Sequence, residues 1–201
     1  MTEKLVQAIE RYEGDFGLDL APEQIEKLSV YHRLVQKHNP LLHLVAPCDE
    51  EEFAVRHLLE SLALLEFLPE NAELADVGTG AGLPSVPCLL VRDDLRGVLI
   101  ESKEKKAAFL REVLSVCGLA DRTLIINKQF EEISSPRYQF VACRALDKFT
   151  RKLPKLLKWA GTSRKLFFGG PALRDELSKN GLTPAEKLMP HSTQRYLFIS
   201  E

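Results

Sequence analysis

The 201-residue sequence has few of the features that mark secreted, zinc-binding or membrane proteins. Its four cysteines, Cys48, Cys88, Cys117 and Cys143, are scattered and form no C-x-x-C pair, which argues against a disulfide framework and a zinc site. No apolar run approaches the ~18 residues that a membrane span needs, and the N-terminus lacks a charged start followed by an apolar segment. We therefore expect a soluble, cytoplasmic protein with buried thiols, no membrane partner and no metal.

Residue sets typical of hydrolases are also missing. The chain has no H-E-x-x-H motif and no convincing Ser-His-Asp or Cys-His set. Its net charge of -2 shows no overall excess of the positive charge that nucleic-acid binders use. A 45% hydrophobic content suffices for one solid core, since a chain of this length buries about 70% of its unfolded surface. We expect one catalytic domain.

The most informative segment that is present runs from Leu74 to Pro84. An apolar run ends at Asp76, three glycines follow at every second position, Gly78, Gly80 and Gly82, and a proline closes the segment. Closely spaced glycines allow positive φ and let a ligand approach the bare main chain. Proline suits the start of a helix, where its missing N–H would be unpaired anyway. The pattern predicts a strand, a ligand-binding loop and a helix that begins near Pro84.

The spacing of these glycines differs from that of a dinucleotide site. The dinucleotide fingerprint is G-x-G-x-x-G, whereas here the third glycine comes one residue early and is followed by Leu83. The next apolar run, 97–100, ends at Glu101, at the offset of about 20 residues where an acidic side chain accepts the hydroxyls of a ribose. Together the loop and the carboxylate indicate an adenosine-type ligand. The alternative is an ordinary tight turn and a surface glutamate.

These residues resemble the bacterial ribosomal RNA small-subunit methyltransferase G family, also called glucose-inhibited division protein B. The motifs that carry the resemblance are Asp76–Pro84, Leu99–Ser102, Lys105-Lys106, Phe109–Arg111 and Cys143-Arg144-Ala145, with weaker similarity at His38-Asn39 and Arg56–Leu62. The resemblance covers roughly residues 30 to 170. It implies S-adenosylmethionine as cofactor, N7 of a guanine in 16S ribosomal RNA as methyl acceptor, and that RNA or the small ribosomal subunit as partner.

Candidate cofactor residues follow from both arguments. The residues themselves indicate backbone contact at Gly78, Gly80 and Gly82, ribose binding by Glu101, and contact between Asp76 and the ammonium of the cofactor. The resemblance implies cofactor contacts at Gly78, Leu83, Phe130, Glu131 and Arg144. Because Arg144 follows an apolar run at the carboxyl end of a strand, where open α/β sheets bind ligands, we expect it to position the reactants. A salt-bridged arginine is the alternative.

The charges are distributed unevenly along the chain. The basic segment, residues 144–165, carries eight basic residues and a single acid, Asp147. The basic residues are Arg144, Lys148, Arg151, Lys152, Lys155, Lys158, Arg164 and Lys165. The lysines and arginine from 148 to 158 recur every three or four residues, which places them on one helix face. We expect Lys148, Arg151, Lys152 and Lys155 to bind RNA phosphates, the alternative being a solvated face. The resemblance adds Lys105 and Lys106 as RNA contacts.

Apolar runs and helical stretches alternate along the chain. Runs lie at 73–77, 97–101, 123–127, 138–143, 164–168 and 194–200, helical stretches at 84–91, 103–117, 147–160 and 172–180, and amphipathic helices at 3–12, 23–37 and 51–67. This alternation predicts an α/β fold with a mainly parallel sheet. The resemblance implies a Rossmann-like S-adenosylmethionine-dependent methyltransferase fold with an antiparallel last strand. We expect a helical N-terminal segment, 1–70, and a methyltransferase domain, 71–201, in one integrated unit and a monomer.

The proposed chemistry needs no catalytic base. Guanine N7 has a free in-plane lone pair, so its methylation requires no proton removal. We therefore assign no catalytic residue and expect Arg144 to position the reactants. Two departures from the family pattern bear on the acceptor: Phe168 precedes Gly169-Gly170 where a lysine is usual, and His43-Leu44-Val45 replaces Asn-Leu-Thr. The alternatives are a methyltransferase with another acceptor, an RNA-binding module with reduced or lost catalysis, and an NAD-dependent reductase.

Overall fold

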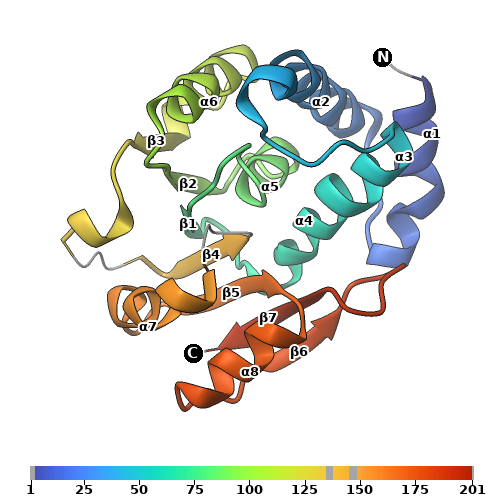
Figure 1. Ribbon diagram of the computed structural model, residues 1–201. Coiled ribbons are helices and arrows are strands. Elements are labelled where there is room, and N and C mark those ends of the chain that lie inside the picture. The colour runs from blue at the N-terminus through green and yellow to red at the C-terminus, as the bar shows by residue number, and fades with distance from the viewer. Residues whose placement is uncertain (1–2, 135–137, 145–148, 201) are drawn as a thin grey trace.

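A twisted sheet lies at the centre of the computed structural model, which describes residues 3–134, 138–144 and 149–200 (Figure 1). Within these residues it has seven strands in the order β3-β2-β1-β4-β5-β7-β6. The strands are β1 (Glu73–Val77), β2 (Arg96–Ile100), β3 (Thr123–Ile126), β4 (Phe140–Arg144), β5 (Arg164–Gly169), β6 (Ala185–Leu188) and β7 (Tyr196–Ser200). Strands β1 to β5 pair in parallel, whereas β7 is antiparallel to both β5 and β6. The predicted Rossmann-like α/β fold with an antiparallel last strand is confirmed.

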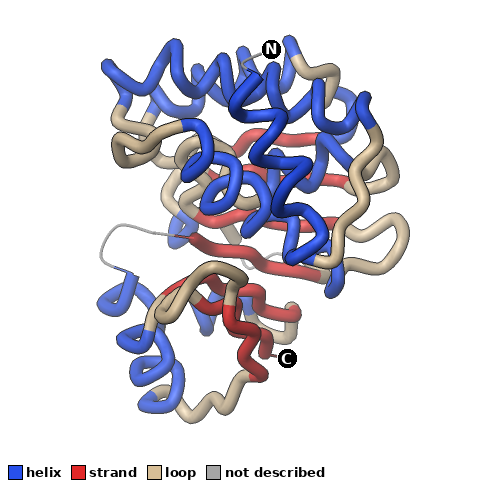
Figure 2. Tube along the Cα trace, turned by 90° about the vertical axis from the view of Figure 1, so that its right-hand side faces the viewer, coloured by secondary structure: helices blue, strands red, loops and turns tan. Residues whose placement is uncertain are grey.

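Helices cover both faces of the sheet (Figures 1 and 2). The main helices are α1 (Glu3–Tyr12), α2 (Pro22–Leu42), α5 (Ser85–Val91), α6 (Glu104–Val116), α7 (Phe149–Ala160) and α8 (Pro171–Lys179). A further helical segment combines α3 (Glu50–Phe53), π-helical turns at Ala54–Leu59, α4 (Glu60–Leu62) and a 3-10 turn at Ala63–Phe67. Short 3-10 turns lie at Glu13–Phe16, Ala120–Arg122 and Phe130–Glu132. None of the described helices is both long and apolar enough for a bilayer crossing.

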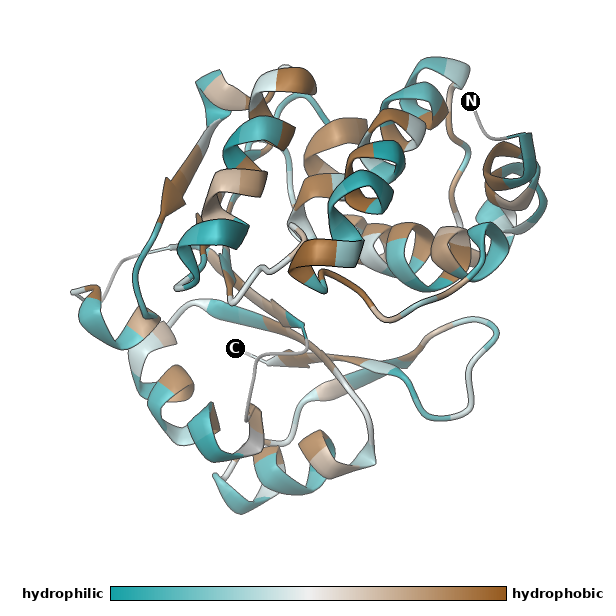
Figure 3. Ribbon diagram, turned by 45° about the horizontal axis from the view of Figure 1, so that its top comes forward, coloured by the Kyte–Doolittle hydropathy of each residue, from teal (hydrophilic) through white to brown (hydrophobic). Residues whose placement is uncertain are grey.

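Two hydrophobic cores lie on opposite faces of the sheet. Successive residues of a strand point to opposite faces, so Leu74 joins the core shared with the N-terminal helices, α5 and α6, while Ala75 joins the core shared with α7 and α8. In β5, Leu166 belongs to the first of these cores and Phe167 to the second. Figure 3 shows hydrophobic and hydrophilic residues on the same helices, as amphipathic covering elements require.

The N-terminal helices pack directly on the sheet layer. Residues Leu28, Tyr31 and Val35 of α2 are fully buried in the first core, together with residues of α5 and α6. The hydroxyl of Tyr31 donates a hydrogen bond of 2.9 Å to the carbonyl oxygen of Ala81 in the glycine loop. One continuous core therefore joins the helical segment to the loop that follows β1.

The predicted elements differ from the structure at several places. The prediction missed β6, because Ala185–Leu188 is a mostly exposed edge strand and its sequence, Ala-Glu-Lys-Leu, carries no apolar run. Helix α2 continues to Leu42, beyond the predicted end at 37, and contains Pro40, which removes one backbone N–H from its last turn. Pro84 precedes the first residue of α5 and follows a cis peptide bond with Leu83.

Candidate functional site

The candidate site lies where the strand order changes direction. Strand β1 has β2 on one side and β4 on the other, and crevices at such switch points bind ligands in open α/β sheets. Asp76 pairs with Ala142 in the parallel register of β1 and β4. Two residues further along the chain lie Gly78, just after β1, and Arg144, the last residue of β4, so the glycine loop and the arginine start at the same level of the sheet edge.

The glycine loop has the backbone conformation that its sequence predicts. Gly78, Gly80 and Gly82 have φ values of 71°, 56° and 96°, all in the region that favours glycine. A Cβ at Gly82 would lie 2.5 Å from Cγ2 of Val86, so this glycine lets the loop pack on α5. A Cβ at Gly80 would meet only the carbonyl oxygen of Gly78, at 3.8 Å. The loop is thus closed against the core at its third glycine and open at its second.

Glu101 lies directly beneath this loop. Its carboxylate accepts the backbone N–H of Gly80 at 3.0 Å through Oε2 and that of Lys103 at 2.8 Å through Oε1. Only 6% of the residue is exposed. Asn127, immediately after β3, donates to the carbonyl oxygen of Glu101 at 2.8 Å and ties the ends of β2 and β3 together. The carboxylate at the end of β2 is thus joined directly to the glycine loop, and its binding of a ribose stays a prediction.

Asp76 is the buried acid of the site. Its Oδ2 accepts hydrogen bonds from the hydroxyl of Thr79 at 2.7 Å and from the backbone N–H of Ser85 at 3.3 Å. Among the described residues its Oδ1 has no hydrogen-bond partner. Burial raises the pKa of Asp76 to about 7, because desolvation of the carboxylate outweighs these hydrogen bonds. Oδ1 of Asp76 is therefore a hydrogen-bond acceptor beside the loop that has no donor among the described residues.

The two predicted residues of the turn after β3, Phe130 and Glu131, lie in different surroundings. The ring of Phe130 is buried in the second core, 5.9 Å from the ring of Trp159 and edge-on to it. Glu131 is exposed on the same turn. The Phe130 side chain therefore stabilises the core beneath α7, and Glu131 is the side chain of this pair that is free to meet a ligand. Leu83 is buried within the first core next to the loop.

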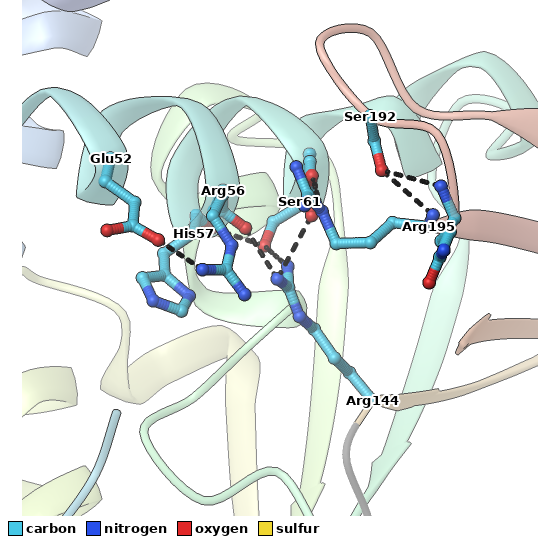
Figure 4. A network of polar contacts seen from close by, with 9 residues as sticks. Glu52, Arg56, His57, Ser61, Arg144, Ser192 and Arg195 are labelled. Carbon is cyan, nitrogen blue, oxygen red and sulfur yellow. Dashed lines mark hydrogen bonds and ion pairs between the residues drawn. The ribbon is translucent and has the colours of Figure 1, made fainter. Parts of the chain in front are cut away.

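Arg144 is held in a network with the N-terminal helical segment (Figure 4). Its Nη2 donates to the backbone carbonyl of Arg56 at 2.5 Å and lies 3.2 Å from Oε2 of Glu60. Glu60 is 1% exposed and its other oxygen, Oε1, accepts from Nε of Arg195 at 2.5 Å. One buried carboxylate therefore holds two arginines that come from β4 and from the residue before β7.

Arg144 also faces an open pocket. Its side chain is 13% exposed, and burial lowers its pKa while the carboxylate of Glu60 opposes that shift. Its guanidinium lies 5.5 Å from the ring centre of Phe168, the residue that ends the apolar run of β5. Phe168, Arg144 and Glu60 all line a pocket of about 540 Å³. The geometry shows a salt-bridged arginine at the edge of a pocket, and the positioning of reactants by Arg144 stays a prediction.

The candidate RNA-binding residues occupy two surfaces. On α6, Lys105 is exposed and Lys106 is half-buried, its Nζ 3.4 Å from the carbonyl oxygen of His43. On α7, Arg151, Lys155 and Lys158 are exposed along one face, opposite the buried residues Leu153, Leu156 and Trp159. Lys152 is half-buried, with Nζ 5.9 Å from the ring centre of Phe130. Lys148 lies outside the described residues.

The basic segment is not a continuous surface. Arg144 is taken up by Glu60, and Lys165 is buried with its Nζ donating to the carbonyl oxygen of Gly161 at 2.7 Å. The sequence prediction that both belong to the basic surface was wrong, because residues of a central strand alternate between the two covered faces. The exposed part of that surface is the outer face of α7.

Three functional candidates were missed by sequence reasoning. Glu60 lay within a segment noted only for its resemblance, and Arg195 lay in a predicted strand, so neither carried a signal of its own. In the sequence, nothing distinguished Tyr31 from the other residues of its helix that face the core, and its hydrogen bond to Ala81 is seen only in the structure. His57, in the N-terminal segment that resembles the family, packs on Phe53, and burial beside arginines lowers its pKa to about 3.

In the described part of the chain, no group of three or more His, Cys, Asp or Glu side chains is placed to hold a metal.

Solved structures with the same fold include methyltransferases. An RNA methyltransferase from Salinibacter ruber, in complex with S-adenosyl-L-homocysteine, aligns with a TM-score of 0.56 and 17% identity over 77% of this chain and 92% of that protein. A putative O-methyltransferase from Nostoc punctiforme aligns with a TM-score of 0.63 and 12% identity, over 90% of this chain and 69% of that one. At these identities the likeness shows the fold alone.

Sequence comparison identifies the family. Similar proteins named ribosomal RNA small subunit methyltransferase G include one from Pelotomaculum thermopropionicum, 38% identical over 57% of this chain and 49% of that protein, and one from Neisseria meningitidis, 32% identical over 72% and 68%. The chain thus spans about half the length of the first and about two thirds of the second. A family model described as "GidB: rRNA small subunit methyltransferase G" matches residues 24–186. The chain belongs to the rRNA small subunit methyltransferase G family.

Proposed function

We propose that this protein is an S-adenosylmethionine-dependent methyltransferase that methylates N7 of a guanine in 16S ribosomal RNA. The observation that carries the proposal is the hydrogen bond from Gly80 to Glu101, which joins an open glycine loop to a buried carboxylate at the switch point of the sheet. Family membership supports the reaction and the acceptor. The relatives' names support ribosomal RNA as the substrate class.

The residues of the site fit an adenosine with a charged amino-acid tail. The open side of the loop at Gly80 leaves room for close approach to the main chain, and Glu101 offers a carboxylate to ribose hydroxyls. The free Oδ1 of Asp76 offers an acceptor for an ammonium group. Gly78, Gly82, Leu83, Phe130, Glu131 and Arg144 complete the proposed cofactor set. When bound, the cofactor supplies an electrophilic methyl group on its sulfonium.

Catalysis then depends on alignment and on charge. Guanine N7 attacks with a lone pair that needs no deprotonation, so no general base is required and placement of the acceptor supplies the rate. Methylation leaves the base cationic, and Asp76 and Glu101 are the buried acidic side chains of the site that can oppose that charge in water-poor surroundings. Arg144 positions the reactants from the end of β4.

Exposed and half-buried cations provide the proposed RNA contacts. Lys105, Lys106, Arg151, Lys152 and Lys155 are the residues that we propose to bind phosphates, which supply most sequence-independent affinity. The partner is 16S ribosomal RNA or the small ribosomal subunit. We further propose that the protein acts as a monomer in the cytoplasm.

The decisive test compares ribosomal RNA from cells with and without the protein. Mapping of N7-methylguanosine is expected to show one 16S position that loses its methyl group in the deletion strain and regains it when the gene is restored. Unchanged N7 methylation would contradict the proposed acceptor. Calorimetry with S-adenosylhomocysteine and with NAD separates the methyltransferase from the reductase alternative, and cofactor binding without methyl transfer would favour an inactive RNA-binding module.

A further inference from the structure

A pocket beside Arg144 joins charged and aromatic side chains. It has a volume of about 540 Å³, within the usual size of a small-molecule site. Its lining includes Arg56, Glu60, Arg144, Phe168, Arg195 and Tyr196. Arg144, at the end of β4, is the residue that this pocket shares with the proposed cofactor set.

The pocket carries an excess of positive charge. Three guanidinium groups, those of Arg56, Arg144 and Arg195, line it against one carboxylate, that of Glu60. Arg56 is paired with Glu52 on the preceding turn. Arg144 and Arg195 share Glu60, which neutralises only one of them. One positive charge therefore remains uncompensated, and an anion would complete the cluster.

Arg195 is the cation with free donors. It binds Glu60 through Nε, and no described residue accepts a hydrogen bond from its two terminal nitrogens. Its side chain is 34% exposed, compared with 13% for Arg144. The backbone N–H of Arg195 donates to the hydroxyl of Ser192 at 2.9 Å, which fixes the loop before β7 (Figure 4). A guanidinium held through one nitrogen presents its remaining pair as a fork that matches a phosphate.

Two aromatic rings also line the pocket, and each lies beside a guanidinium. The ring centre of Phe168 is 5.5 Å from Arg144, and that of Tyr196 is 4.6 Å from Arg174. An arginine fork on the O6 and N7 edge of guanine would cover the atom to be methylated. The arginines therefore suit a phosphate of the acceptor strand and leave the N7 edge free for the reaction.

We propose that this pocket receives one nucleotide of the acceptor RNA, with its phosphate on Arg195. The proposal rests on the proposed function for the identity of the RNA. Glu60 is a positioning residue that holds Arg144 and Arg195 at the proper separation. Arg195 lies outside residues 24–186, the part of the chain that the family model matches.

The test uses the protein saturated with S-adenosylhomocysteine and compares binding of guanosine 5′-monophosphate and guanosine by NMR titration. The intact protein is expected to bind the phosphorylated nucleoside at least tenfold more tightly. Arg195→Met is expected to abolish that preference while leaving the affinity for guanosine within twofold. The matched control is Arg33→Met, which removes another partly exposed, ion-paired arginine and is expected to change neither affinity.

A second readout uses unmodified 16S ribosomal RNA. Arg195→Met is expected to raise KM for the RNA about tenfold with little change in kcat, and to reduce the salt slope of RNA binding by about one. Equal binding of the two nucleosides by the intact protein, or a preference that survives Arg195→Met, would overturn the inference. Failure of the intact protein to methylate the RNA, with the phosphate preference present and dependent on Arg195, would overturn the proposed function alone.

Discussion

The hydroxyl of Tyr31 donates a hydrogen bond of 2.9 Å to the carbonyl oxygen of Ala81, 50 residues later in the chain. Tyr31 belongs to the N-terminal helix α2 and is completely buried, whereas Ala81 lies in the middle of the glycine loop. The side chain passes through the first core to support the loop from behind. The N-terminal helices thus take part in shaping the candidate cofactor site.

Tyr31→Phe removes this hydrogen bond and keeps the ring. The carbonyl of Ala81 then loses its partner in the core, so we expect the free energy of unfolding to fall by about 1 kcal/mol. We also expect S-adenosylhomocysteine to bind more weakly, because the loop loses a support. Urea denaturation and calorimetry measure the two effects. Tyr138→Phe, at a half-buried tyrosine elsewhere in the chain, is the control and should leave cofactor affinity unchanged.

Gly82→Ala tests the closed end of the loop. The new methyl group would lie 2.5 Å from Cγ2 of Val86, and the φ of 96° is unfavourable for any side chain. We expect a loss of about 2–4 kcal/mol in thermal or urea unfolding. Gly118→Ala is the matched control, since its φ is also positive, 67°, but nothing lies within 4 Å of the added Cβ. Equal losses at both positions would show that backbone conformation alone matters.

The sequence predicted this loop and Glu101 well because both depend on local patterns. The glycines follow a strand directly, and the carboxylate ends the next strand, so parallel pairing of β1 with β2 brings them together. Glu60 and Arg195, in contrast, meet across 135 residues. No periodicity links them, because their contact depends on how the helical segment packs beside the last two strands. Strand β6 was missed for a related reason, since an exposed edge strand has no apolar pattern.

Asp76 is expected to make stability depend on pH. Burial raises its pKa from 3.8 to about 7 in the folded protein. The folded state therefore binds this proton more tightly than the unfolded state, and the stabilisation is complete below about pH 3.8 and lost as the pH rises through 7. The slope is at most about 1.4 kcal/mol per pH unit for one group.

Asp76→Asn removes this titration and keeps an acceptor for Thr79. We expect the stability of the native protein relative to the variant to fall between pH 4 and 7, as measured by urea denaturation at each pH. Taking the difference cancels the other titrating groups, such as Asp94, whose pKa is lowered by its hydrogen bond with Arg92. Parallel stability profiles for the two proteins would mean that Asp76 keeps an ordinary pKa.

The exposed face of α7 is expected to carry salt-dependent RNA affinity. Arg151→Glu combined with Lys155→Glu replaces two exposed cations of this face by anions. We expect RNA affinity to fall at least tenfold at low salt, and the slope of log Kd against log salt to flatten by about two. Filter binding at several salt concentrations measures both quantities. Lys4→Glu combined with Arg11→Glu makes the same charge change on exposed positions of α1. If both double variants lose affinity equally, net charge and not this face determines binding.

Glu60→Gln tests whether the buried carboxylate holds its two arginines. The substitution keeps size but leaves the buried guanidinium of Arg144 without a counter-charge, so we expect a loss of about 3–5 kcal/mol in the free energy of unfolding. Glu52→Gln is the matched control on the same helical segment. It breaks a pair in which both side chains are 41% exposed, and its cost should stay below about 1 kcal/mol.

A second substitution tests why Glu60→Gln is expected to lower the free energy of unfolding. If the unpaired charge of Arg144 destabilises Glu60→Gln, then Arg144→Met in that background removes the charge and should restore part of the lost stability. If the loss came instead from disturbed packing around α4, the added substitution would lower stability further. Urea denaturation of the two single variants and the double variant distinguishes these outcomes, because only a charge effect makes the second change stabilising.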